Sequence, residues 1–95
     1  MNKAEILFID KAIKRGGTLM YSKKDALRFV TECLKQNIIL LGIDGFILGE
    51  HTTQPRVEDS IDFSMRPFTK DIYDEAIVFL TLRDDSLFFE IVCSD

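Results

Sequence analysis

An Asp-Gly pair inside a long apolar segment is the feature that most constrains the fold. The run Ile38–Ile43 is apolar throughout, and Asp44-Gly45 separates it from Phe46–Leu48. Both central positions of a type I′ turn need a positive φ, which Asp and Gly tolerate. The segment therefore predicts a tight β-hairpin that turns at Asp44-Gly45.

The turn also predicts a register. Opposing residues would be Ile43 with Phe46, Leu41 with Leu48, Gly42 with Ile47, and Leu40 with Gly49. Because both sides of this hairpin are apolar, both need covering. We expect helices on one side, and the first helix, a second copy or a different protein on the other.

Helical periodicity predicts three helices. The first covers Asn2 to Arg15 and stops at Gly16-Gly17; the second is capped by Ser22 and ends before Asn37; the third follows Pro67, with Thr69 or Asp71 as its cap.

The remaining segments predict a loop and two strands. Glu50 to Asp59 is polar and unpatterned, Val57 to Phe63 alternates as a short half-exposed strand, and Leu87 to Cys93 is the closing strand after a turn at Asp84-Asp85-Ser86. The expected fold class is α+β, with a mainly antiparallel sheet of three to four strands packed with about three helices in the order ααβββαβ.

Length and composition predict one domain over residues 1–95. The chain is 46% hydrophobic, which is enough for a packed core, so we expect it to fold without a cofactor or metal. Asn37 to Ile43 is too short to cross a bilayer and the N-terminus lacks a secretory signal, so we expect a cytoplasmic protein without membrane contact. Cys33 and Cys93 are interpreted as small core residues.

Charge is unevenly divided along the chain. Through Leu40 eight Lys or Arg residues face four acids, a net of +4, whereas from Leu41 onward twelve acids face four bases, a net of −8; together they give the overall −4. An acidic half repels phosphate and attracts a basic protein through long-range steering. A merely solvated acidic surface is the simpler interpretation.

Three segments are similar to a known family. They are "NIILLGIDGF" (37–46), "QPRVEDSIDFS" (54–64) and "LFFEIV" (87–92), within a similarity over roughly residues 22 to 92. The chain resembles the immunity proteins of bacterial polymorphic toxin systems, including contact-dependent growth inhibition, and most closely the immunity protein 40 family. The resemblance implies a cytoplasmic protein that binds and neutralises the C-terminal domain of a cognate toxin, often a nuclease. It implies no catalytic residues and no fixed set of contact residues.

Carboxylates on a rigid sheet suit such a role, because they can occupy the Lys- and Arg-lined cleft of a nuclease and shut out its substrate. The candidate partner-binding residues are Asp44, Phe46, Glu50, Glu58, Asp59, Asp62, Asp84 and Asp85, with Tyr73 as a further possible aromatic anchor. Each acid also has a simpler interpretation as solvated surface or a local turn residue; for Asp44 the turn explains it fully. Glu90, in the closing strand, must be edge-exposed, paired or in contact with a partner.

Other classes of function stay open. An enzyme would need a poised His, Cys or carboxylate pair, and the only histidine, His51, is expected in a loop; a metal site could combine it with Glu50 and Glu58. A nucleic-acid binder would use the basic residues Lys11, Lys14, Arg15, Lys23, Lys24, Arg28 and Lys35. The overall acidity argues against direct nucleic-acid contact. The strongest alternative is a small homodimeric adaptor or interaction module without a toxin partner.

Overall fold

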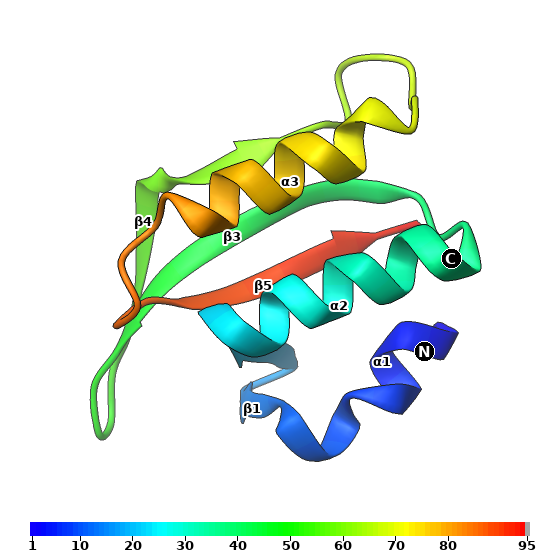
Figure 1. Cartoon of the computed structure of the whole chain (residues 1–95). Helices are drawn as coiled ribbons and strands as arrows, with labels where there is room; N and C mark the ends of the chain where they lie inside the picture. The colour runs from blue at the N-terminus through cyan, green and yellow to red at the C-terminus, as the bar shows by residue number, and fades with distance from the viewer. Residues whose placement is uncertain (95) are drawn as a thin grey trace.

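One antiparallel sheet with helices packed on one face makes up the fold of the computed structural model, which describes residues 1–94 (Figure 1). The five strands lie in the order β1-β2-β5-β3-β4. The elements are α1 (Lys3–Leu7), the 3-10 helix η1 (Ile9–Lys11), β1 (Ile13–Arg15), β2 (Thr18–Ser22), α2 (Lys23–Gln36), β3 (Leu40–Leu48), β4 (Thr53–Asp62), α3 (Asp71–Thr81) and β5 (Phe88–Cys93). The α+β class is confirmed, while the strand number and order differ from the prediction.

The two long helices agree with the sequence, except that the N-cap of α3 is Lys70, which makes no side-chain cap hydrogen bond, and not the predicted Thr69 or Asp71. Ser22 is the N-cap of α2 and its hydroxyl accepts a hydrogen bond from the Asp25 N–H, and Asn37 ends the helix with a φ of 57°. Both helices lie over the same face of the sheet (Figure 1). Their inward stripes meet β5 and β3 in one core, in which Phe29, Cys33 and Leu80 are fully buried.

A lysine joins the two helices at one end. Lys23 Nζ donates to the Thr81 and Arg83 carbonyl oxygens at 2.9 and 2.8 Å. The Thr81 carbonyl belongs to the last turn of α3 and the Arg83 carbonyl to the residues just after it, where backbone acceptors lack helical partners and a cation is favoured. The N-terminus of α2 therefore caps the C-terminus of α3.

The Asp44-Gly45 hairpin prediction is wrong. β3 runs straight through both residues, and Gly45 has partners on both sides, Arg56 of β4 and Phe89 of β5. The turn lies further on, where the Gly49 N–H donates to the Thr52 carbonyl. Asp and Gly tolerate a turn but do not require one, and pairing along both edges of β3 outweighs the local preference. The predicted register is wrong for the same reason.

The predicted polar loop from Glu50 to Asp59 is mostly strand. β4 lies at one edge of the sheet, so its side chains are largely solvated and its first half, Thr53 to Arg56, carries no apolar alternation. The alternating segment predicted from Val57 falls mainly in its second half. Pro55 fits there, because an edge strand has one side without ladder hydrogen bonds.

A bulge in β4 presses against β3 at a glycine. The partner of β3 shifts from Ile61 at Ile43 to Arg56 at Gly45, so residues 57–60 form a bulge. The Gly45 N–H donates to Ser60 Oγ at 3.1 Å. A Cβ at position 45 would lie 2.3 Å from the Asp59 carbonyl oxygen.

The first helix is also much shorter than predicted. Only Lys3–Leu7 is α-helical; the later half of the expected helix forms η1 and β1. Gly16, with a φ of 60°, and Gly17 form the turn of the β1–β2 hairpin rather than a helix stop. The apolar spacing was misleading, since Ile6 and Ile9 are 59% and 45% exposed.

The β1–β2 hairpin bends over the sheet face that is turned away from α2 and α3, which we call the outer face. Thr18–Met20 pairs with β1, whereas Tyr21 and Ser22 pair with β5, so β2 changes partner midway. Neighbouring residues of a strand point to opposite faces, and Tyr21 lies in the core on the helix side. Met20 therefore points to the outer face, where it is nevertheless only 2% exposed. The Arg15 guanidinium donates to the Gly49 and Thr52 carbonyls and ties the hairpin to the β3–β4 turn.

In the described part of the chain no helix is long and apolar enough to span a membrane.

Replacing Gly45 with alanine tests the tight approach of the bulge. We expect Gly45→Ala to lower the free energy of unfolding by roughly 1–3 kcal/mol, because the methyl group would overlap the Asp59 backbone. Urea denaturation measures this. The matched control is Gly17→Ala, whose added Cβ has no atom within 4 Å. Equal denaturation midpoints for the two variants would contradict the packing described.

Candidate partner-binding surface

Two carboxylates stand side by side on the outer face. Phe89 and Ile91 of β5 are buried beneath the helices, so the alternation of the strand turns Glu90 outward. Asp44 is its direct partner on β3. Among the described residues, no side-chain nitrogen of Lys, Arg or His lies within 4 Å of an oxygen of either carboxylate. Burial, and then the nearby Asp44, raise the pKa of Glu90.

This placement corrects the expectation for Asp44 and bears on that for Glu90. Asp44 lies in the middle of a strand, so a turn role does not explain it. Glu90 is partly buried on β5, and because β2 pairs with β5 only at Phe88 and Phe89, one side of the strand is an open edge at Glu90, which is one of the expected environments. Like charges directly opposite each other destabilise a sheet. The pair therefore weakens the free protein.

Two other predicted acids have local roles. Asp62 accepts hydrogen bonds from the Ser64 N–H and hydroxyl, and Asp84 accepts the same pair from Ser86. These bonds lower the pKa of both aspartates, because they stabilise the charged form. Asp62 also lines a shallow groove beside Asp44, whereas Asp84 shapes the turn before β5.

Three further acids are paired with the chain's own cations. Glu58 lies 2.9 Å from Arg56 Nε, Asp59 lies 3.4 Å from the same nitrogen, and Asp85 lies 3.2 Å from Lys23 Nζ. Glu58 and Asp85 are exposed, and exposed ion pairs are worth little, so a partner could displace them. Asp59 is only 18% exposed and also approaches Arg83, so it belongs mainly to the β4 bulge.

The last two predicted residues lie at the far end of the outer face. Glu50 is 89% exposed in the β3–β4 turn, with the His51 imidazole 3.8 Å away. Phe46 faces Phe88 and shares a hollow with Met20 beneath the β1–β2 hairpin. Tyr73 is not an exposed anchor, because it is 2% exposed and donates to the Ile38 carbonyl at 2.6 Å.

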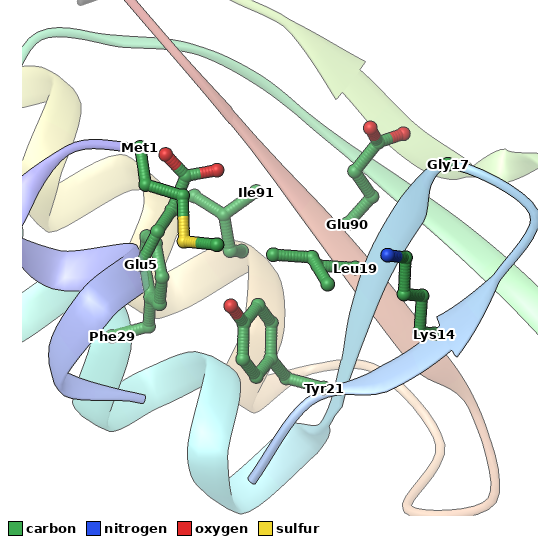
Figure 2. A pocket seen from close by; sticks show the side chains of 9 residues that line it. All are labelled: Met1, Glu5, Lys14, Gly17, Leu19, Tyr21, Phe29, Glu90 and Ile91. Atoms are coloured by element: carbon green, nitrogen blue, oxygen red, sulfur yellow. The ribbon is translucent and has the colours of Figure 1, made fainter. Parts of the chain in front are cut away.

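A cleft of about 260 Å³ opens between α1, the β1–β2 hairpin and β5 (Figure 2). Its polar lining residues are Glu5, Lys14, Tyr21 and Glu90. Tyr21 is 1% exposed and its hydroxyl has no hydrogen-bond partner among the described residues. Burial and the nearby Glu5 raise the pKa of Tyr21 to about 12, so the hydroxyl is neutral.

Sequence reasoning missed this cleft. It drew attention to Glu90, but it placed Tyr21 in a connection between two helices and Lys14 on a helix. The signal was Gly16-Gly17, which can be a helix stop or a hairpin turn. Reading it as a turn would have brought Lys14 and Leu19 together as paired residues.

The remaining predictions concern the two cysteines and a metal site. Cys33 is fully buried and Cys93 packs against the same core, as expected of core residues; contact with Cys93 and burial raise the pKa of the Cys33 thiol. Over residues 1–94 no group of three or more His, Cys, Asp or Glu side chains is arranged to hold a metal ion.

A scan against protein-family models finds no match to this chain, and a comparison with curated proteins finds none either.

Replacing Glu90 with glutamine tests the cost of the carboxylate pair. The folded pKa of Glu90 lies above its ordinary value of 4.5, so ionisation opposes folding and stability is lost as pH rises through that window. We expect Glu90→Gln to be more stable than the natural chain at pH 7, by up to roughly 1 kcal/mol. The gain should vanish below about pH 4.5. Urea denaturation across pH 3.5–7 checks this.

Asp74→Asn is the control, since Asp74 is an exposed acid on α3. Its stability relative to the natural chain should not follow the same pH window. A Glu90→Gln variant that is less stable at pH 7 would mean that the carboxylate is satisfied in the folded protein.

Proposed function

We propose that this chain is an immunity protein, which binds the C-terminal toxin domain of a cognate bacterial toxin and neutralises it by covering its active or substrate-binding site. The observation that carries the proposal is the Asp44–Glu90 pair on the outer face. A partner that brings an arginine or lysine to these carboxylates removes their mutual repulsion and forms charge-assisted hydrogen bonds. A nuclease domain, which binds phosphates with such cations, is the partner we propose.

The position of the resembling segments supports this proposal. The segments 37–46, 54–64 and 87–92 contain most of β3, β4 and β5, which are three neighbouring strands of the sheet. The first and third carry Asp44 and Glu90. The resemblance to immunity proteins and the uncompensated charge therefore meet on one surface.

The alternatives find less support. His51, on which an enzyme would depend, is 88% exposed in a turn and lies 3.8 Å from Glu50, so it is not held in a shaped site. Of the basic residues, Lys23 and Arg15 are engaged with backbone carbonyls. A homodimer would bring four like carboxylates of two outer faces together, which opposes self-association through this surface.

Co-expression with the toxin domain encoded beside this chain tests the function. We expect the natural chain to restore growth of cells that make the domain, and the purified pair to form a complex. The double variant Asp44→Asn/Glu90→Gln should bind the domain at least about tenfold more weakly at low salt, because two desolvated charge pairs are lost. Its affinity should also depend less on salt concentration.

Asp74→Asn changes one exposed charge on the helix layer and should retain full affinity. Equal affinity of the natural and double-variant chains would remove the outer face from the interface. Growth protection that persists when no complex forms would refute the proposed function, and so would turnover of a substrate by the chain alone.

A further inference from the structure

Two features that weaken the free protein lie in one cleft. The Tyr21 hydroxyl is buried without a hydrogen-bond partner among the described residues, and an unpaired buried hydroxyl is unfavourable for folding. Glu90, on another wall, is partly buried next to a like charge. Figure 2 shows both side chains around the same space. Groups that lower the stability of the free protein and lie close together are typical of a binding site.

The cleft has a defined size and charge. Its volume of about 260 Å³ is below that of sites for drug-sized ligands, so it suits a single side chain or a similarly small group. Two carboxylates, Glu5 and Glu90, line the cleft together with the ammonium groups of Lys14 and Met1, and among the described residues no cationic nitrogen comes within 4 Å of an oxygen of either carboxylate. Leu19, Phe29 and Ile91 supply apolar walls. The matching group is a cation on an apolar stem.

The arrangement of acceptors favours a guanidinium group over an ammonium group. The Tyr21 oxygen and the Glu90 carboxylate belong to different strands and lie on different walls, as Figure 2 shows. Guanidinium presents five N–H donors in a planar fork, so it can reach two separate acceptors at once. An ammonium is a compact, strongly hydrated charge that is harder to desolvate in such a cleft.

The cleft is also open to an approaching polypeptide. β2 pairs with β5 only at Phe88 and Phe89, so among the described residues the edge of β5 from Glu90 to Cys93 has no strand beside it on this side. A second hollow, lined by Met1, Glu5 and this stretch of β5, continues from the cleft along that edge. A side chain carried by an extended segment can enter from there.

We propose that this cleft receives the arginine side chain of a partner protein, with Tyr21 Oη and the Glu90 carboxylate accepting hydrogen bonds from its guanidinium. This rests on the proposed function for the identity of the partner, which would be the toxin domain. Binding would supply the missing partner of Tyr21 and the missing counter-charge of Glu90. The stem of the arginine would lie against Leu19 and Ile91.

Nuclear magnetic resonance titration of the full chain tests the cleft by itself. The probe is N-acetyl-L-arginine N-methylamide, and its control is the citrulline analogue, which has the same shape without the charge. We expect the arginine probe to shift the backbone amides of Tyr21, Glu90 and Ile91 in the millimolar range, and the citrulline probe to leave them unchanged. Equal responses to both probes, or no saturable shift, would overturn the proposal.

Tyr21→Phe is the decisive variant, because it removes only the hydroxyl. We expect it to bind the arginine probe about tenfold more weakly, as for a lost hydrogen bond to a charged group. Its melting temperature should equal or exceed that of the natural chain. Undiminished binding, or a clear loss of stability, would mean that the hydroxyl is already satisfied in the free protein and would overturn the proposal. Asp74→Asn should change neither property.

Two comparisons separate this proposal from the proposed function. If Tyr21→Phe keeps full affinity for the toxin domain while cells stay protected, the cleft proposal fails and the immunity function stands. If the arginine probe binds but no toxin domain is neutralised, the immunity function fails and the cleft stands as a guanidinium site. Tighter binding of free L-arginine than of the blocked probe would indicate a small metabolite and would overturn the assignment to a protein side chain.

Discussion

The pairing of β3 along both of its edges is the constraint on which the rest of the structure depends. This strand is bonded to β5 on one side and to β4 on the other over most of its length. Its continuity keeps Asp44 in the sheet, opposite Glu90, and brings the bulge of β4 onto Gly45. Had the chain turned at Asp44, the two carboxylates would not have met on one surface.

The helices cover only one face of this sheet. The outer face is covered at one end and open to solvent in the middle. At one end the β1–β2 hairpin folds over Phe46, its own Met20 is buried, and Arg15 holds the hairpin in place. In the middle, the outer face carries carboxylates instead of apolar residues. An antiparallel sheet tolerates a solvated face, so the fold does not require a partner. The charge pattern, rather than exposed apolar area, is what favours one.

How much the sequence could predict depended on whether local signals and tertiary pairing agreed. The helix after Ser22 was predicted because a cap and an apolar stripe coincide there, the helix after Pro67 because of its apolar stripe, and Leu87 to Cys93 as a strand because of its dense apolar and aromatic content. Asp44-Gly45 and Gly16-Gly17 were misread, since each pair permits more than one backbone path and distant strands decide between them. Of the site, Glu90 was recognisable as a carboxylate inside a strand. Tyr21 was not, because its environment is created by the bend of β2.

The anchoring of the hairpin by Arg15 has a consequence for the side chains that the β3–β4 connection can carry. Its guanidinium donates hydrogen bonds to the carbonyl oxygens of Gly49 and Thr52. Its one hydrogen bond to a side chain is a longer one, at 3.4 Å, to the Thr53 hydroxyl. Main-chain acceptors are supplied by any amino acid. Arg15 itself therefore does not restrict the side chains of the β3–β4 connection, which is limited instead at Gly49, where an added Cβ would lie 2.4 Å from Thr52 Oγ1.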